Sequence, residues 1–306
     1  MSNLTFVSIC CLTYNHTLFI RQCIDGFIMQ KTKFPFEVLI HDDASTDGTA
    51  DIIREYELKY PDIIKPIYQT QNQYSKGILI SRKYNYSRAK GKYIAMCEGD
   101  DYWTDPDKLQ RQIDLLENNK NISLSTENGL VKNSIENTEY LFNDETKESY
   151  YTAYEMVQSR RFPTASAVFL KDYILSNTKY KLSHDTATWV FLSTKGKVHY
   201  YPIVSSVYNR GKHGIVEGTD PLKMSIMAKE WQKNIIQIIK NSSFNDNFNY
   251  TIFSENNINQ YYSAFCKYSF LKNPFKKLYC ILTCIKINPL IFLKKSKNKI
   301  KNYFNH

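Results

Sequence analysis

The chain has 306 residues, of which 42% are hydrophobic, 14% aromatic and 23% charged. This length and composition allow a substantial buried core, which excludes an intrinsically disordered chain and a fibrous one. The net charge of +10 lies at one end, because residues 256–306 contain ten lysines and no Asp, Glu or Arg. The remainder of the chain is neutral overall, so the basic balance does not indicate a nucleic-acid-binding protein.

Seven cysteines are scattered along the chain without a paired Cys-x-x-Cys spacing. An odd number of cysteines and no secretory signal are typical of free thiols in a reducing compartment. We therefore expect a cytoplasmic protein without a structural zinc site. His41, His199 and His213 also lack the spacing of metal ligands, and we expect surface or packing roles for them.

The first 118 residues alternate short apolar runs with amphipathic segments. Strands are expected at residues 6–12, 36–40, 63–68 and 93–97, and helices at 19–28, 47–60, 75–89 and 106–118. This alternation predicts an α/β fold with a Rossmann-like, mostly parallel central sheet and helices on both faces. Ligands bind such sheets at the carboxyl ends of the strands, so the residues that follow the strands are the first candidates for a site.

The rest of the chain is less regular. Residues 119–150 are rich in Asn, Glu and Ser, which favours a loop or a mobile excursion. Later elements are expected as a strand at 164–170, a helix at 186–195, short strands at 198–201 and 205–208, and a helix at 221–240.

Acidic residues follow two of the predicted strands. Asp42 and Asp43 come directly after the second strand, where they either cap the next helix or contact the base or ribose of a nucleotide. Glu98, Asp100 and Asp101 follow the fourth strand around Gly99. Adjacent carboxylates repel one another unless a cation lies between them, and carboxylate oxygens suit Mg²⁺ or Mn²⁺. A solvated acidic turn is the simpler alternative.

Two more features bear on the same region. Tyr102 and Trp103 directly follow the acidic cluster, and we expect them to place aromatic surface in the same cleft. Asp185 precedes the helix predicted at 186–195. It is either an ordinary helix cap or a general base for an acceptor hydroxyl.

Three blocks in this order resemble the family-two glycosyltransferases of the A-type fold: VSICCLTYN, HDDASTDGT and GKYIAMCEGDDYWTDPDKLQRQIDLL. The resemblance is close over residues 4–118 and extends more weakly to about residue 215 through FPTASAVF, SHDTATWVFLSTKGKVHYY and SSVYNR. It implies inverting transfer of a sugar from a nucleotide-sugar, here UDP-hexose, to a saccharide acceptor. It further implies a lipid-linked acceptor and synthesis of bacterial surface polysaccharide, O-antigen or lipooligosaccharide.

The resemblance also assigns roles to individual residues. Asp185 matches the catalytic base, and Asp100 matches the metal ligand of the family's Asp-x-Asp motif. The family's nucleotide-binding positions match residues in three segments of this chain: Thr13, Tyr14, Asn15, Asp42, Asp43, Glu98 and Gly99. Further contacts to the acceptor or the diphosphate are expected from Asp101, Tyr102, Trp103, Arg210 and His213. The sequence departs from the family pattern at Glu98, where Asp is more usual, and around His213, where the family's Tyr-Arg-His spacing is not cleanly kept.

Three regions follow from this assignment. Residues 1–118 form the half that binds the nucleotide-sugar, and residues 119–215 form the acceptor half of the same catalytic domain. Residues 216–306 form a helical extension with a basic, amphipathic tail, and the apolar run at 278–293 is too interrupted for a comfortable transmembrane helix. Lysines beside a partly apolar helix favour peripheral attachment to an anionic membrane surface, on the inner face of the cell membrane, although a packed helical pair is the alternative.

Two other functions are compatible with parts of the sequence. A nucleotidyltransferase uses the same kind of sheet and metal, but it needs a glycine-rich basic loop after the first strand, where this chain has Thr13, Tyr14 and Asn15. A non-catalytic module that binds a membrane or polymer through the basic tail would leave the acidic clusters as turns.

Overall fold

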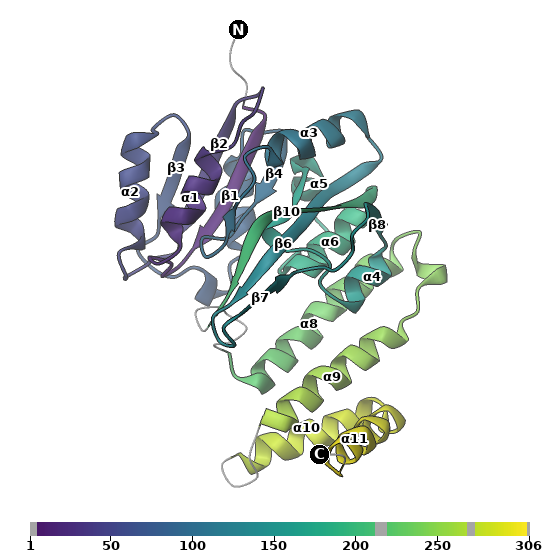
Figure 1. Cartoon of the computed structure of the whole chain (residues 1–306). Helices are drawn as coiled ribbons and strands as arrows, with labels where there is room; N and C mark the ends of the chain where they lie inside the picture. The colour runs from purple at the N-terminus through teal and green to yellow at the C-terminus, as the bar shows by residue number, and fades with distance from the viewer. Residues whose placement is uncertain (1–4, 212–218, 268–272, 305–306) are drawn as a thin grey trace. The chain divides into compact units, whose positions relative to one another are not determined.

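The computed structural model describes residues 5–211, 219–267 and 273–304 (Figure 1). The chain divides into two compact units, Met1–Gly211 and Lys212–His306. The first unit contains a ten-stranded sheet with its covering helices, and the described part of the second unit is helical.

Four parallel strands form one half of the sheet, in the order β3–β2–β1–β4. They are β1 (Val7–Thr13), β2 (Phe36–Asp42), β3 (Ile64–Tyr68) and β4 (Tyr93–Met96), with helices α1 (Ile20–Ile28) and α2 (Thr49–Lys59) between the first three. Nearly every residue of β1 and β2 is buried, as a strand covered on both faces requires. The apolar runs therefore predicted these strands correctly.

The other half of the sheet mixes strand directions, in the order β9–β6–β10–β5. Its strands are β5 (Tyr102–Trp103), β6 (Ile122–Asn133), β9 (Val168–Leu170) and β10 (Lys197–Arg210), with β7 (Thr138–Leu141) and β8 (Ser149–Tyr151) paired to β6 and β10. β9 is antiparallel to both β4 and β6, so β6 and its parallel neighbour β10 point the same way as β4. Most of the sheet thus runs in one direction, as predicted.

The prediction of a loop over residues 119–150 is wrong, because β6 crosses the centre of the sheet. Its polar side chains misled the prediction: Ser123, Ser125, Thr126, Glu127 and Asn128 are each at most 2% exposed. They are bonded within the protein. Thr126 Oγ1, for example, donates to the carbonyl oxygen of His199 at 2.7 Å. A polar composition usually indicates a solvent-exposed segment, but buried polar groups that have hydrogen-bond partners are compatible with a central strand.

Two smaller predictions also need correction. Residues 75–89 do not form one helix but short 3₁₀ and π turns at Tyr74–Lys76, Ser81–Asn85 and Tyr86–Arg88. Side chains of this segment donate to strand carbonyls instead, as Asn85 does to Cys11 at 3.0 Å. The strands predicted at 198–201 and 205–208 are one strand, β10, which is interrupted by irregularities near Pro202, a residue without a backbone donor.

Helices cover both faces of the sheet (Figure 1). On one face α1, α2 and α3 (Lys108–Asn118) bury Phe27, Ile53 and Ile113 in the main hydrophobic cluster. On the other face Trp189 of α6 (Asp185–Ser193) packs on Phe169, which also contacts the segment at residues 81–88. Two short helices, α4 (Ala153–Gln158) and α5 (Lys171–Leu175), complete the described part of this unit.

The second unit contains α8 (Pro221–Lys240), α9 (Thr251–Lys267), α10 (Pro274–Ile287) and α11 (Pro289–Phe304). The predicted helix at 221–240 is confirmed, and Asp220 caps it by accepting hydrogen bonds from the backbone of Leu222 and Lys223. α9 and α10 pack through a small core around Ile258 and Cys284. None of the described helices is both long and apolar enough to cross a membrane. All seven cysteines are free thiols, and only Cys266 on α9 is exposed.

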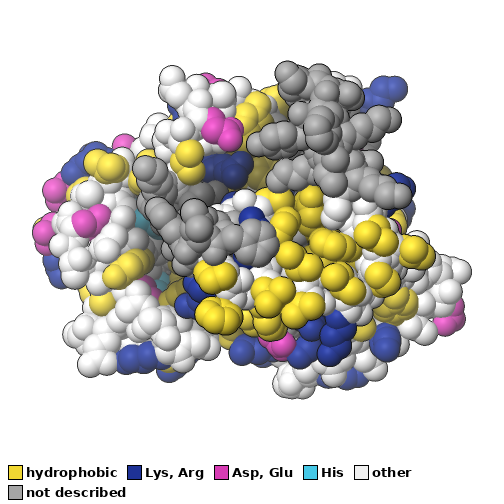
Figure 2. Space-filling model, turned by 90° about the horizontal axis from the view of Figure 1, so that it is seen from below, with side chains coloured by type: hydrophobic (Ala, Val, Ile, Leu, Met, Phe, Trp, Pro, Cys, Tyr) yellow, Lys and Arg dark blue, Asp and Glu magenta, His cyan; other side chains and the backbone are white. Residues whose placement is uncertain are grey.

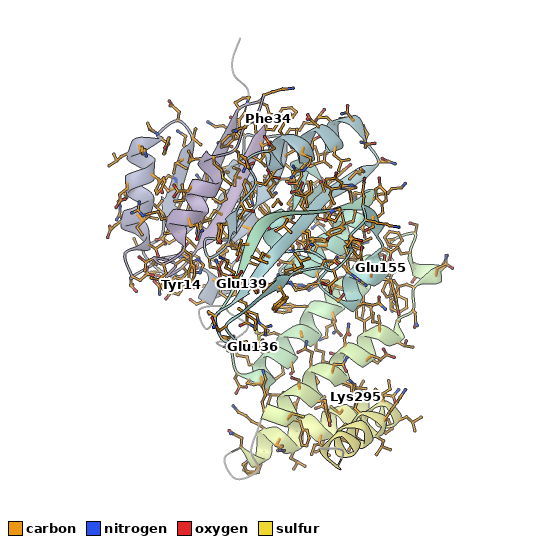
Figure 3. The ribbon with its side chains drawn as sticks, in the orientation of Figure 1. Tyr14, Phe34, Glu136, Glu139, Glu155 and Lys295 are labelled. Atoms are coloured by element: carbon orange, nitrogen blue, oxygen red, sulfur yellow. The ribbon has the colours of Figure 1, made fainter. Side chains whose placement is uncertain are left out.

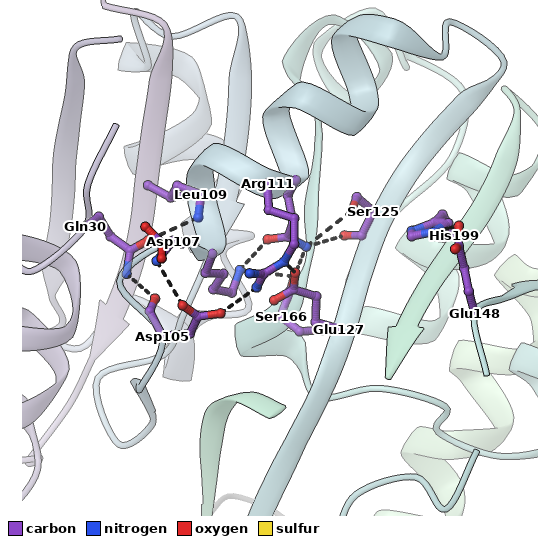
Figure 4. Close-up of polar contacts among 12 residues, drawn as sticks. Gln30, Asp105, Asp107, Leu109, Arg111, Ser125, Glu127, Glu148, Ser166 and His199 are labelled. Atoms are coloured by element: carbon purple, nitrogen blue, oxygen red, sulfur yellow. Dashed lines mark hydrogen bonds and ion pairs between the residues drawn. The ribbon is translucent and has the colours of Figure 1, made fainter. Parts of the chain in front are cut away.

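A buried polar network joins α3 to the sheet of the first unit (Figure 4). Lys108 is fully buried, and its Nζ donates to Gln112 Oε1 at 2.6 Å and to the carbonyl oxygen of Ser166 at 3.2 Å. Arg111 bridges Asp105 and the buried Glu127 at 2.6 and 2.8 Å. Burial lowers the pKa of Lys108 to about 8, because the charged form loses its hydration.

This pKa predicts how the stability of the fold depends on pH. The unfolded chain binds the Lys108 proton more tightly than the folded chain, so the folded state gains stability as the pH rises from about 8 towards the ordinary lysine pKa of about 10.4. The free energy of unfolding of the wild type, relative to Lys108→Met, should therefore increase over this range. Chemical denaturation of both proteins at a series of pH values measures it. A constant difference would contradict the prediction.

Candidate active site

Three segments that follow parallel strands meet at one edge of the sheet. Thr13, at the end of β1, is the register partner of Asp42 at the end of β2. The backbone N–H of Gly99, which follows β4, donates to the carbonyl oxygen of Leu12 at 2.8 Å. The predicted convergence of these clusters is therefore found, and it follows from the parallel pairing of their strands.

Gly99 allows the segment after β4 to approach β1 closely. A Cβ atom at this position would lie 2.7 Å from both Cβ and Oγ1 of Thr13 and 3.0 Å from Nδ1 of His16. A side chain here would push the acidic residues on either side of Gly99 away from the edge of the sheet. The glycine is thus required by packing.

Glu98, Asp100 and Asp101 form a compact acidic cluster, with one ligand oxygen from each lying within 4.8 Å of the others. Burial, with the negative charges of Asp185 and Asp100, raises the pKa of Glu98 to about 8. Burial and the same neighbouring acids raise the pKa of Asp101 as well. The chain's own groups therefore leave the negative charge of this cluster incompletely balanced.

The cluster fits a divalent cation. Three carboxylates at this spacing supply hard oxygen ligands, which Mg²⁺ and Mn²⁺ prefer, and leave room for oxygens of a substrate. A bound cation would also supply the positive charge that the raised pKa values of Glu98 and Asp101 indicate is missing. The donor set and the electrostatics thus agree on the kind of ion.

Asp185 is the first residue of α6, and its negative charge acts on Glu98, so the two carboxylates are neighbours. The helix cap is His184, and Asp185 instead accepts a hydrogen bond from Oγ1 of Thr164, on a different segment. A side-chain hydroxyl that donates to one carboxylate oxygen fixes the carboxylate and leaves its other oxygen available. The sequence pattern gave no signal for Thr164.

The loops after β1 and β2 hold each other in place. Asn15, at a positive φ of 57°, accepts from the backbone of Thr46 at 2.8 Å. Asp42 is bonded to the hydroxyl of Ser45, and burial raises its pKa. Both oxygens of Asp43 accept backbone N–H groups of the segment at residues 73–74, at 2.7 and 2.9 Å. Asp43 therefore anchors a loop.

Two residues of the nucleotide segment remain available for a ligand. The side chain of Tyr14 is 46% exposed at the end of β1 (Figure 3). The buried Oγ1 of Thr13 has no hydrogen-bond partner among the described residues. A buried hydroxyl without a partner is costly, which favours a polar ligand at this point.

The prediction of an aromatic cleft wall is wrong for Trp103. This side chain is 2% exposed, its Nε1 donates to the carbonyl oxygen of Ala165 at 2.6 Å, and its ring packs edge-on against Phe27. Tyr102 is also buried, at 8% exposed. Their strand β5 pairs with β10, so the two rings point to opposite faces of the sheet and both are buried there. Arg210 is exposed at the end of β10, and His213 lies outside the described residues.

Asn209 supports the acidic cluster and was not among the predicted site residues. Its Nδ2 donates to the carbonyl oxygen of Asp100 at 2.6 Å, and its backbone N–H donates to Oδ1 of Asp101 at 2.9 Å. It lies at the end of β10, so a strand of the second half of the sheet holds ligands that belong to the first half. Asn209 lies about 110 residues from the acidic cluster in sequence, so no local pattern predicts this role.

Asn209→Ala should weaken metal binding. It removes the side-chain bond to Asp100, and a lost hydrogen bond of this kind costs about 1–3 kcal/mol when a polar partner is left unsatisfied. We expect Mn²⁺ affinity to fall several-fold in titration calorimetry with nucleotide present. Asn119→Ala is the matched control, since its Nδ2 also donates to a carbonyl, that of Leu115, on the exposed side of α3. Equal Mn²⁺ affinity in all three proteins would refute the supporting role.

The family model for "Glycosyl transferase family 2" matches residues 8–167. The uncharacterized protein Rv1520 of Mycobacterium tuberculosis is 33% identical over 222 residues, which are 68% of this chain and 60% of that protein. This chain thus spans less than two thirds of that relative. The Escherichia coli protein WfaP, named a UDP-Glc:alpha-D-GlcNAc-diphosphoundecaprenol beta-1,3-glucosyltransferase, is 36% identical over 114 residues, 37% of this chain and 42% of WfaP.

Among solved structures, S. aureus TarS 1–349 in complex with UDP-GlcNAc has a similar fold, with a TM-score of 0.67 over 92% of this chain and 81% of that one. The sequence identity is 15%, so this likeness concerns the fold, which is the A type expected from the sequence. The family model covers just over half of the chain, including β1, β2, β4 and the acidic cluster. The chain therefore belongs to glycosyl transferase family 2.

Proposed function

We propose that the chain transfers a hexose from a UDP-hexose to a saccharide hydroxyl with inversion at the anomeric carbon. The observation that carries this proposal is the acidic cluster, in which one oxygen each of Glu98, Asp100 and Asp101 lies within 4.8 Å of the others and the negative charge of Asp185 acts on Glu98. A base on the acceptor side and a cation site on the donor side are the two parts that a single displacement requires.

Asp185 is proposed as the general base. A sugar hydroxyl is a poor nucleophile, so a carboxylate must accept its proton while the new glycosidic bond forms. The hydroxyl of Thr164 holds one oxygen of Asp185, and the other oxygen is the proposed proton acceptor. The acceptor oxygen attacks the anomeric carbon as the bond to the nucleoside diphosphate breaks, and inversion then needs no covalent intermediate.

The acidic cluster is proposed to hold Mn²⁺ or Mg²⁺, with Asp100 as the principal ligand and Glu98 and Asp101 beside it. When bound, such a cation stabilises the negative charge that develops on the leaving diphosphate. Asn209 keeps Asp100 and Asp101 in position for this.

The donor is proposed to lie over the ends of β1 and β2. Thr13 offers an unpaired buried hydroxyl, Tyr14 an exposed ring and Asp42 a carboxylate at this edge. Uracil is the proposed base, since Asp42 can accept from its imide N–H. The names of WfaP and of the TarS complex, which mention UDP-Glc and UDP-GlcNAc, support a UDP-sugar. In this proposal residues 1–118 bind the donor and residues 119–215 bind the acceptor.

A comparison of Asp185→Asn with Asp100→Ala separates base from metal ligand. Asp185→Asn keeps the shape but cannot accept a proton, so UDP release from UDP-hexoses with Mn²⁺ should slow by about 10²–10⁴-fold while UDP binding is retained. Asp100→Ala should lose Mn²⁺-dependent UDP binding and turnover together. UDP should also stabilise the wild type against heat more than GDP does.

The control for both variants is Asp114→Asn, an exposed acid on α3 whose carboxylate accepts only from Gln110 in the described structure. It should match the wild type in all assays. Near-normal turnover in a folded Asp185→Asn protein would remove Asp185 from the reaction, and equal stabilisation by UDP and GDP would remove the uracil assignment.

The second unit is proposed to attach to an anionic membrane surface, which suits a lipid-linked acceptor. Cys280 and Cys284 of α10 are buried, whereas Phe275, Leu278 and Leu282 on its other side are 86%, 49% and 57% exposed. Further exposed apolar side chains are Leu290 and Leu293 of α11. Figure 2 shows such a gathering of hydrophobic side chains with basic side chains at its border.

The exposed apolar face and the lysines of α10 and α11 both support attachment to a membrane. A helix normally buries its apolar face, so an exposed apolar face on α10 and α11 calls for a partner. Lysines are the charged residues of this stretch, and each contributes about 1 kcal/mol near an anionic leaflet. Peripheral attachment on the cytoplasmic side would bring the active site to acceptors carried by a lipid, as in the synthesis of surface polysaccharide, O-antigen or lipooligosaccharide.

Removing two of the exposed leucines should weaken this attachment. Each buried Leu contributes about 1.5–3 kcal/mol, so Leu278→Ser/Leu282→Ser should bind phosphatidylglycerol-containing vesicles at least about tenfold more weakly in co-sedimentation. Added salt should weaken binding of the wild type. The control is Leu58→Ser on α2, where the leucine is 83% exposed. Identical vesicle binding by the double variant and the wild type would contradict the membrane proposal.

A further inference from the structure

A cavity of about 410 Å³ opens beside the end of α4. One wall is formed by residues 142–145, between β7 and β8, and the other by residues 159–161, which follow α4. α4 begins with a capping box, in which Thr152 and Glu155 (Figure 3) each accept a backbone N–H of the other. The residues after this short helix are tied back to it, because the backbone N–H of Ser159 and Nε of Arg161 both donate to the carbonyl oxygen of Glu155, at 3.3 and 3.4 Å.

A gap of only about 10 Å³ separates this wall from the proposed catalytic base. It is lined by Asp185, Thr186 and Trp189 of α6, and it shares Ser159, Arg160 and Arg161 with the larger cavity. A molecule in the larger cavity would therefore contact residues that also border Asp185.

Most polar groups of the larger cavity are bonded to one another. Asn143 donates to Tyr151 at 2.6 Å and to the carbonyl oxygen of Arg161 at 2.9 Å. Glu145 accepts from Ser149 at 2.9 Å and lies 3.8 Å from the guanidinium of Arg161. These groups build the wall, and their charges compensate each other.

Arg160 is different, because it is exposed and held by aromatic rings. Its guanidinium carbon lies 5.3 Å from the ring centre of Phe142 and 5.0 Å from that of Tyr208, and Nη1 donates to the Tyr208 hydroxyl at 3.4 Å. No carboxylate among the described residues lies within 4.0 Å of it. Stacking fixes the plane of a guanidinium while leaving its N–H edge open, which is the arrangement that binds phosphate or carboxylate.

We propose that this cavity is an acceptor subsite and that Arg160 binds a phosphate group carried by the acceptor. The inference rests on the function proposed above and adds the class of acceptor, a saccharide attached to a phosphate ester or diphosphate. The phosphate anchors the acceptor in the larger cavity, and the sugar hydroxyl then lies at Asp185, beside the residues 159–161 that border both.

Binding of glucose 1-phosphate to the protein saturated with UDP and Mn²⁺ tests this, because the donor site is then filled. The wild type should bind glucose 1-phosphate more tightly than methyl glucoside, which has no phosphate, in an NMR or calorimetric titration. Arg160→Gln should weaken glucose 1-phosphate binding about tenfold or more, and Arg160→Lys less, since a point charge remains. UDP affinity should fall much less than glucose 1-phosphate affinity in both variants, since Arg160 acts on the acidic cluster only through its charge.

Arg54→Gln is the matched control. Arg54 is also stacked on an aromatic ring, 4.7 Å from the centre of Tyr68, but it lines neither cavity. It should leave glucose 1-phosphate binding unchanged. Thermal unfolding of each variant shows that it is folded, and the Arg160→Lys protein provides the comparison should Arg160→Gln not fold.

Two results would overturn the inference and leave the proposed function standing. One is a loss of UDP affinity in the Arg160 variants as large as the loss for glucose 1-phosphate, which would place Arg160 on the donor diphosphate. The other is a wild type that binds UDP with Mn²⁺ but shows no preference for glucose 1-phosphate over methyl glucoside. A wild type that binds no UDP with Mn²⁺ would instead overturn both the proposed function and this inference.

Discussion

Repulsion among carboxylates is the constraint on which the active-site end of the sheet depends. Glu98, Asp100, Asp101 and Asp185 gather there, and their mutual repulsion together with burial raises the pKa of Glu98 and Asp101. A fold tolerates such a concentration of charge only if rigid elements hold the groups and positive charge or hydrogen bonds offset part of it. Here rigidity comes from the parallel strands, from the close packing of Gly99 against Thr13 and from the hydrogen bonds that Asn209 donates. The guanidinium of Arg160 supplies opposing charge.

This arrangement also explains why the catalytic unit is one structure and not two independent halves. The strands of the first half deliver the acidic residues, but Asn209 on β10 and Thr164 before β9 fix Asp100, Asp101 and Asp185 from the second half. β9 is the antiparallel link between β4 and β6, so the two halves share a continuous sheet. Residues 1–118 therefore do not position their acidic cluster unaided, whereas Asp185 and the Thr164 that holds it both belong to residues 119–215.

The sequence was sufficient to predict features that depend on local physics. Buried parallel strands read as apolar runs, Asp220 and Pro221 mark the start of α8, and acids after strand ends converge because parallel strands end at one edge. Long-range pairing was not predictable in this way. The polar composition of β6 favours a loop, because the partners that bond its buried Ser, Thr, Glu and Asn are distant in sequence. The sequence near residue 103 likewise gives no sign of the antiparallel pairing with β10 that buries Trp103.

The cysteines have a practical consequence. Burial raises the pKa of the Cys97 thiol to about 11 and raises that of Cys10 further, so these thiols stay protonated and shielded at neutral pH. Cys266 is exposed, on the helix that packs against α10. A maleimide dye would thus attach at a single place in the native protein, one helix away from the apolar surface. The chain carries its own labelling position for fluorescence measurements of that surface, without any engineered cysteine.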